Sequence, residues 1–249
     1  WHLWGEARPG EPPVVLFHGG SGSWTHWVRN IEPLVAAGRQ VIAADLPGFG
    51  DSALPPSGGD ADALVAPLAD GLRRLLGGSP CDLVGFSFGG LTAGLLLAEH
   101  PALARRLVLV GAPAMGVTPE RPFVLKGWRH LPTAEQQEAV HKHNLAALMF
   151  KDPARIDGLA LALHIANVHR DRLPRRRLAR TDMLARSLPR VRCPVAVIYG
   201  AHDALYQGWM PELEAAFEAA VPDFRGLALI PEAGHWVPFE RPEAFDAAL

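Results

Sequence analysis

The stretch Gly85-Phe86-Ser87-Phe88-Gly89 places a serine between two glycines, directly after the apolar pair Leu83-Val84. In a Gly-x-Ser-x-Gly turn between a strand and a helix, the serine backbone is strained and only residues without a side chain fit beside it. The helix predicted to follow would direct its free N–H groups and positive dipole end toward an anion beside Ser87. The pattern predicts a nucleophilic serine, although such a spacing also recurs by chance in a chain with 25 glycines.

A serine hydroxyl needs a base to accept its proton and a third group to orient that base. Asp203 follows the apolar run 195–199, and His235 follows the run 227–230. We therefore predict a catalytic triad of Ser87, His235 and Asp203. Taken singly, Asp203 is also explained as a turn residue and His235 as a loop residue that caps a helix. His202 is a rival base, but it adjoins Asp203 and its side chain is expected to point away.

The glycine-rich segment His18-Gly19-Gly20-Ser21-Gly22-Ser23 directly follows the apolar run 14–17. A tetrahedral intermediate needs two donors that converge on one oxygen, and backbone N–H groups supply them without reorganisation. We assign these donors to Gly20 and Phe88. A phosphate-binding loop would require a Gly-Lys-Ser/Thr ending, which the segment lacks. A purely structural glycine turn remains an alternative.

Short apolar runs alternate with longer helical patterns along the chain. Continuous apolar strands that alternate with helices predict an α/β fold, in which a mostly parallel sheet is covered on both faces. The expected strands lie at 14–17, 41–44, 83–84, 107–110, 195–199 and 227–230, and the early helices lie near 24–37, 62–77 and 88–99. Ligands of such sheets bind at the carboxyl ends of the strands, where the candidate residues lie.

The alternation stops after Pro113 and resumes near Val191. We predict a core made of residues 1–113 and 191–249, with an inserted helical cap at 114–190. Helical patterns cover 133–150 and 154–168, and Thr133 with Gln136 resembles a capping box at a helix start. The predicted cap is basic, with 14 Lys and Arg against 7 Asp and Glu.

Composition excludes several other classes of protein. A chain of 249 residues with 49% hydrophobic residues is long enough for one large core. The net charge of −2 and its distribution do not indicate nucleic-acid binding. No run reaches the roughly 18 apolar residues of a membrane span, and the start does not resemble a signal peptide. Because the sequence begins at Trp1 and stops inside a predicted helix, it is also compatible with truncation at both ends.

These segments together resemble the α/β-hydrolase superfamily, in its cap-bearing branch of small cytoplasmic serine hydrolases. The matching pieces are His18-Gly19-Gly20, Asp45-Leu46-Pro47-Gly48-Phe49-Gly50-Asp51-Ser52, the turn around Ser87, Gly200-Ala201-His202-Asp203 and Gly234-His235. The chain order Ser, Asp, His is that of this family. The family's sheet order implies that strand 107–110 separates the strands after Cys81 and Cys193, too far for a disulfide. Two free thiols predict a reducing compartment, most simply the cytoplasm.

Residue types discriminate between branches of this superfamily. Ser87 argues against the haloalkane dehalogenases, which carry an aspartate nucleophile. Residues 27–38 resemble a helix of the meta-cleavage-product hydrolases, which break carbon–carbon bonds in dienoates. In that branch an asparagine commonly precedes the nucleophile, and Phe86 cannot make the same polar contact. Proline iminopeptidases share the His-Gly-Gly-x-Gly loop, but their free-amine pocket would need an acidic cap.

We therefore expect hydrolysis of a small carboxylic ester through an acyl-enzyme. Carbon–carbon hydrolysis of a dienoate is the alternative, and a ligand-binding protein without turnover is the alternative from another class. Neither a metal nor an organic cofactor is implied. The expected partner is a small-molecule substrate, with no nucleic acid or membrane, and the oligomeric state is left open.

Substrate contacts are predicted for Phe86, Trp236 and Arg180. Arg180 ends a run of arginines that either binds a substrate carboxylate or forms a solvated cap surface. The other members of this run are Arg170, Arg172, Arg175, Arg176 and Arg177. A second set of cap residues is interpreted as exposed helix rather than as a metal site, because no acidic partner lies at ligand spacing. It consists of His141, His143, His164 and His169.

Overall fold

The computed structural model describes residues 1–117, 123–173 and 175–249. The strands of this part of the chain form one sheet in the order β1-β3-β2-β4-β5-β6-β7, parallel throughout except for the antiparallel pair β1 and β3. Their bounds are His2–Trp4 (β1), Val14–Phe17 (β2), Val41–Ala44 (β3), Cys81–Phe86 (β4), Ala104–Val110 (β5), Val195–Gly200 (β6) and Phe224–Ile230 (β7). The predicted α/β class is confirmed. β1 was not predicted, because three residues carry too little pattern.

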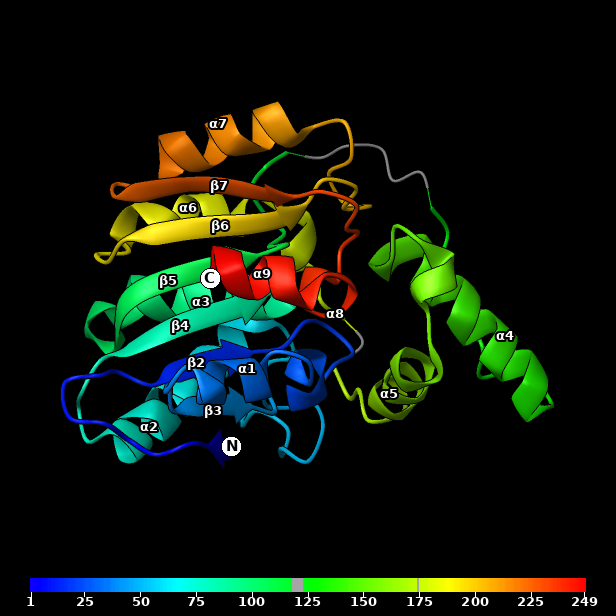
Figure 1. Ribbon diagram of the computed structural model, residues 1–249, viewed down its shortest axis with the longest axis horizontal. Helices are drawn as coiled ribbons and strands as arrows, with labels where there is room; N and C mark the ends of the chain where they lie inside the picture. Colours follow the sequence, from blue (N-terminus) through cyan, green and yellow to red (C-terminus); the bar gives the residue numbers. More distant parts are fainter. Residues whose placement is uncertain (118–122, 174) are drawn as a thin grey trace.

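Helices cover both faces of the sheet (Figure 1). Successive residues of a strand point to opposite faces, so each buried strand supplies two separate cores. Val15 and Leu83 belong to the core shared with α2, α3, α6 and α7, whereas Val14 and Val84 belong to the core shared with α1, α8 and α9. The bounds are Ile31–Ala36 (α1), Val65–Leu76 (α2), Phe88–Glu99 (α3), Met183–Ser187 (α6), Met210–Ala220 (α7), Val237–Glu240 (α8) and Pro242–Ala248 (α9).

Helix α3, which begins directly after Ser87, is buried on all sides. Every residue from Phe88 to Leu97 is buried, because all but Thr92 are apolar or glycine and the Thr92 hydroxyl donates to the Phe88 carbonyl within the helix at 2.9 Å. Its first turn is thereby held rigidly beside the end of β4.

In the described segments, no helix combines the length and the apolar character that crossing a membrane requires.

Residues between β5 and β6 place α4 (Ala134–Asn144) and α5 (Gly158–His169) beyond the carboxyl ends of the strands (Figure 1). Thr133 caps α4 as predicted, since its Oγ1 accepts a hydrogen bond of 3.2 Å from the Gln136 N–H. The helix expected from residue 154 begins only at Gly158, because Asp157 caps it at the Ala160 N–H. The division into a core and a cap with the predicted boundaries stays a prediction.

The two cysteines and the order of the central strands agree with expectation. β5 lies between β4 and β6. Cys81 and Cys193 are both free and buried, and burial raises the pKa of their thiols to about 12 and about 11. Both thiols are therefore protonated at neutral pH.

A buried carboxylate ties the amino-terminal end of β4 to its neighbours. Asp82 is 1% exposed and accepts hydrogen bonds from Arg39 at 2.6 Å and from Arg105 Nε at 2.7 Å. Burial opposes ionisation of Asp82, but the hydrogen bonds from Arg105 and Arg39 outweigh it and hold the pKa below its usual value. The ion pairs stabilise the fold at neutral pH, and this contribution is lost as pH falls through the folded-state pKa.

We predict that Asp82→Asn lowers the free energy of unfolding at pH 7 by about 2 kcal/mol, because it leaves Arg39 and Arg105 without their buried partner. The loss should be smaller at pH 3, because this pH lies below the ordinary aspartate pKa of about 3.9, so that the unfolded wild-type chain binds a proton there that the folded chain resists. Urea denaturation at both pH values measures it. The control is Asp70→Asn, which removes an exposed pair with Arg73 and should change stability by less than about 0.5 kcal/mol. Equal effects of the two substitutions would contradict the prediction.

Candidate active site

The turn at residues 85–89 holds Ser87 in a strained backbone conformation, with φ 50° and ψ −117°. A Cβ on Gly85 would lie 2.6 Å from the Gly89 carbonyl oxygen, and a Cβ on Gly89 would lie 2.4 Å from the His18 carbonyl oxygen. Such distances are too short for any side chain. Both positions therefore require glycine because neighbouring backbone, which cannot move aside, passes within contact distance.

Ser87, His235 and Asp203 meet at the carboxyl end of the sheet. His235 Nε2 lies 2.9 Å from Ser87 Oγ, and His235 Nδ1 lies 2.8 Å from Asp203 Oδ2. The carboxylate can only accept, so Nδ1 carries the proton and Nε2 is free to accept the serine proton. Asp203 is fully buried and His235 is 2% exposed. This arrangement can activate the serine hydroxyl as a nucleophile.

Three strand ends position these groups. Ser87 follows β4, Asp203 lies in the turn after β6, and His235 lies in the loop after β7. The Leu205 N–H donates to Asp203 Oδ1 at 2.9 Å, which leaves Oδ2 for the imidazole. Gly111, at the end of β5 with φ 55°, lets the chain pass directly under the imidazole, since a Cβ there would lie 3.0 Å from His235 Cε1. The side chain of the rival base, His202, points to Glu232, and its Nε2 lies 3.8 Å from Glu232 Oε1.

The loop after β2 lies against the serine turn. A Cβ on Gly19 would be 3.2 Å from Ser87 Cβ. Two buried histidines shape this loop: the Gly19 N–H donates to His26 Nδ1 at 3.2 Å, and His18 Nδ1 donates to the Gly19 carbonyl at 2.7 Å. His18 Nε2 accepts from the Leu46 N–H at 2.9 Å. Each ring nitrogen named here therefore has a partner that suits a neutral imidazole.

Burial keeps both histidines neutral. It lowers the pKa of His18 to about 4, and burial together with His18 lowers the pKa of His26 well below its usual value. The hydrogen bonds of these two uncharged rings thus hold the backbone of the loop that carries Gly20. Phe88 is the first residue of α3, and an N–H in the first turn of a helix has no partner within the helix. Gly20 and Phe88 remain our predicted oxyanion donors.

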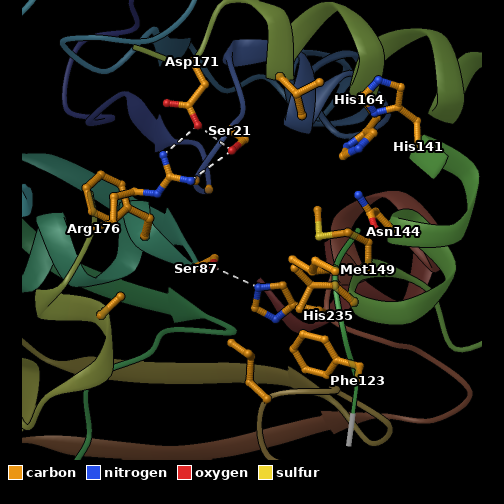
Figure 2. Close-up of a pocket in the computed structure, with 18 of the residues that line it drawn as sticks. Ser21, Ser87, Phe123, His141, Asn144, Met149, His164, Asp171, Arg176 and His235 are labelled. Carbon is orange, nitrogen blue, oxygen red and sulfur yellow. Dashed lines mark hydrogen bonds and ion pairs between the residues drawn. The ribbon is translucent and has the colours of Figure 1, made fainter. Parts of the chain in front are cut away.

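A cavity of about 690 Å³ opens above Ser87 and His235 and extends under α4 and α5 (Figure 2). Phe86 and Arg180 line it, and their contact with a substrate stays a prediction. Trp236 is not among the described residues that line it. Trp236 is 1% exposed, its indole N–H donates to the His26 carbonyl at 3.0 Å, and its ring stacks on Phe239. Trp236 therefore packs inside the protein and does not line the cavity, where the sequence prediction had placed it.

Arg176, which the sequence did not distinguish from its neighbours, reaches the loop after β2, where a Cβ on Gly20 would lie 3.1 Å from its Nε. Its guanidinium donates to Asp171 Oδ2 at 2.7 Å and to Ser21 Oγ at 3.0 Å (Figure 2). It also lies over the rings of Phe49 and Phe88. Asp171 also accepts from Ser21 Oγ at 2.5 Å. Arg176 is thus neutralised by a neighbouring carboxylate and links the α5–α6 segment to the loop after β2.

Arg172, unlike Arg176, is not among the described residues that line the cavity. It donates through its backbone N–H to the Gly48 carbonyl at 3.0 Å and through Nη2 to the Gly50 carbonyl at 3.1 Å. Arg170 pairs with Asp51. These two arginines therefore fasten the chain after α5 to the loop at residues 45–52.

The interpretation of the cap histidines as exposed is wrong for two of them. His141 is 1% exposed and His164 is partly buried, whereas His143 and His169 are exposed. His141 and His164 both line the cavity. Their position on facing helices, which depends on how α4 and α5 pack, was not readable from their spacing. The described residues contain no group of three or more His, Cys, Asp or Glu side chains able to hold a metal ion.

A second group that the sequence did not reveal is Glu240, which is 1% exposed. Its carboxylate accepts from the Gly234 N–H at 2.6 Å, the Lys151 N–H at 3.1 Å and the Asp152 N–H at 3.0 Å. Gly234 immediately precedes His235. Glu240 therefore positions the histidine loop and joins it to the segment after α4.

We predict that Glu240→Gln impairs both stability and catalysis, because an amide N–H₂ would face backbone N–H groups that now bind a carboxylate oxygen. The free energy of unfolding should fall by about 1–3 kcal/mol, and kcat/KM should fall about tenfold or more as the imidazole shifts. Thermal denaturation and ester hydrolysis measure the two effects. Glu243→Gln, at an exposed carboxylate on α9, is the matched control. Equal behaviour of the two variants would show that other contacts hold the loop.

Comparison with known proteins agrees with this geometry. Residues 14–248 match the model of the alpha/beta hydrolase family. A 2-hydroxy-6-oxo-6-phenylhexa-2,4-dienoate hydrolase of Burkholderia cepacia is 29% identical over 97% of this chain and 87% of its own. A carboxylesterase of Bacillus subtilis superposes with a TM-score of 0.77 at 22% identity, covering 99% of this chain and 85% of its own. An esterase of Thermogutta terrifontis superposes with a TM-score of 0.71 at 25% identity, covering 99% of this chain and 89% of its own. This chain belongs to the alpha/beta hydrolase family and is a hydrolase.

Proposed function

We propose that this hydrolase cleaves a small carboxylic ester through a covalent acyl-enzyme. The observation that carries the proposal is the continuous hydrogen-bond chain from Ser87 Oγ through His235 to Asp203 Oδ2, at the floor of the cavity. Because the Asp203 carboxylate is buried and also hydrogen-bonded by a backbone N–H, it can stabilise the imidazolium that forms when the serine proton moves.

The reaction has two halves. His235 Nε2 takes the Ser87 proton as the oxygen attacks the ester carbonyl, and the N–H groups of Gly20 and Phe88 bind the oxyanion. His235 then protonates the leaving alcohol. A water molecule, activated by the same imidazole, cleaves the acyl-enzyme and releases the acid. The cavity takes the acyl or alcohol part of a small-molecule substrate.

Two features favour an ester over an acidic dienoate. Phe86 packs beside His235 with ring centroids 5.0 Å apart, so the residue before the nucleophile contributes an apolar surface to the site. Arg176 is paired with Asp171, so its charge is already balanced next to the loop after β2. Neither group supplies the polar or cationic contact that a charged dienoate would require there.

We predict that Ser87→Ala and Asp203→Asn each lower kcat/KM for p-nitrophenyl butyrate by about 10⁴-fold, because the nucleophile or the correct imidazole tautomer is lost. The release of p-nitrophenol under multiple-turnover conditions measures the effect and also excludes a ligand-binding protein without turnover. His202→Ala is the control, since His202 points to Glu232 and should leave kcat/KM within about twofold. Full activity of the Ser87→Ala variant would contradict the proposal.

The second candidate is hydrolysis of a carbon–carbon bond in a dienoate. It is favoured by the relative from Burkholderia cepacia, whose name describes a dienoate hydrolase and which aligns with 97% of this chain. Arg180, on the cavity wall, would be the cation that meets a substrate carboxylate. In this case Ser87 and His235 would retain their roles.

The two candidates differ in a direct assay. If the site prefers esters, 2-hydroxy-6-oxo-6-phenylhexa-2,4-dienoate should keep its visible absorbance in the presence of enzyme that turns over p-nitrophenyl butyrate. Bleaching with kcat/KM at least about tenfold above that for the ester would instead assign the carbon–carbon reaction. In that event Arg180→Gln should raise KM for the dienoate and leave KM for the neutral ester unchanged, because only the dienoate carries a carboxylate.

A further inference from the structure

Two histidines line the part of the cavity under α4 and α5, across from Ser87 and His235 (Figure 2). His141 extends from α4 and His164 from α5, and their rings make an edge contact with centroids 5.3 Å apart. Within residues 1–117, 123–173 and 175–249, neither ring nitrogen of His141 has a hydrogen-bond partner, nor does His164 Nε2. All three of these nitrogens are buried.

Buried polar atoms in folded proteins are almost always hydrogen-bonded, because an unpaired one has lost its hydration without compensation. Three such atoms gathered at one end of a cavity therefore point to a ligand. The proposed mechanism does not use them, since His235 alone reaches Ser87. Their place at the far end of the cavity suits the end of the substrate remote from the bond that is cleaved.

Aromatic contacts hold the ring of His141 in place. Trp128 packs against His141 at 4.8 Å and against His169 at 4.3 Å between centroids. The side chain of Asn144, one turn along α4 from His141, is bound to the backbone N–H and carbonyl of Lys126 at 2.8 and 2.9 Å. The segment that carries Trp128 is thereby fastened to α4, and the histidine pair is organised before any ligand binds.

The two rings are neutral at neutral pH. Burial lowers the pKa of His141, with His169 adding to the effect, and burial together with His141 lowers the pKa of His164 to about 4. A neutral imidazole carries one N–H and one lone pair. The pair therefore supplies both donors and acceptors at this end of the cavity, without a charge.

We propose that His141 and His164 form a subsite for an uncharged hydroxyl group at the remote end of the substrate. A hydroxyl both donates and accepts a hydrogen bond, which matches a lone pair on one ring and an N–H on the other. A methyl group would leave the nitrogens unpaired. The inference rests on the proposed ester hydrolysis only in that the same cavity holds the reacting ester.

The test compares substrates that differ at one terminal group. The pair is the p-nitrophenyl ester of 6-hydroxyhexanoate and that of heptanoate, in which CH₃ replaces OH. We expect His141→Phe and His164→Phe each to lower the kcat/KM ratio of the hydroxyl ester to the methyl ester by about three- to tenfold, the range of one or two hydrogen bonds. Phenylalanine keeps the ring volume and the contact with Trp128. His143→Phe, at an exposed histidine on the same helix, should leave the ratio unchanged.

A binding experiment separates the subsite from the chemistry. The wild-type enzyme and His164→Phe are each titrated with 6-hydroxyhexanamide and with heptanamide, and binding is followed by tryptophan fluorescence. The preference for the hydroxyl compound, expressed as the ratio of the two dissociation constants, should be larger in the wild type than in His164→Phe. If neither ester is turned over but this preference holds, ester hydrolysis is wrong and the subsite stands. If the esters are hydrolysed with the same ratio in wild type, His141→Phe and His164→Phe, the subsite is wrong and ester hydrolysis stands.

The p-nitrophenyl monoester of heptanedioate tests the charge of the group. A preference for this carboxylate over heptanoate that disappears in both phenylalanine variants would overturn the assignment to an uncharged hydroxyl. If His141→Phe does not fold, as judged by its thermal transition, His164→Phe and the fluorescence titrations still decide the question, because His164 is less buried and contributes one unpaired nitrogen rather than two.

Discussion

The close approach of two backbone turns, one after β2 and one after β4, is the constraint on which the site depends. β2 and β4 are hydrogen-bonded neighbours with Phe17 opposite Gly85, so the loops that follow them must leave the sheet side by side. They fit only because Gly89 lets the His18 carbonyl pass at contact distance. The strained backbone of Ser87 and the loop at Gly19 and Gly20 are consequences of this contact, and α3, buried on all sides, keeps it from relaxing.

Two neutral histidines and a buried carboxylate hold the loops on either side of Ser87 in place. His18 and His26 support the glycine loop as uncharged hydrogen-bonding rings, because burial makes protonation costly. Glu240 supports the histidine loop by accepting backbone N–H groups. The charges of Arg176 and Asp171 cancel locally at the cavity wall. The imidazole of His235 is therefore held by the loop that Glu240 supports and by its contact with the buried carboxylate of Asp203.

The chain between β5 and β6 contributes to the site more than its composition indicated. Three of its arginines bind the loops of the sheet: Arg172 donates to backbone carbonyls of the loop at residues 45–52, Arg170 pairs with Asp51, and Arg176, which pairs with Asp171, also donates to Ser21. Among the described residues that line the cavity, the buried polar atoms without a hydrogen-bond partner belong to His141 and His164. If the proposed subsite binds a hydroxyl group, substrate selection by this segment depends on hydrogen bonding as well as on the cation of Arg180, which also lines the cavity.

The sequence alone determined the alternating strands and helices, the serine turn, and the order of Ser87, Asp203 and His235, because local periodicity and glycine spacing report directly on backbone geometry. It could not separate Arg176 from the neighbouring arginines, recognise Glu240, or place Trp236 away from the cavity and His141 inside it. Those outcomes depend on which face of a helix or loop meets another segment distant in sequence. Only the packing of α4 and α5 over the sheet, and of α8 against the histidine loop, decided them.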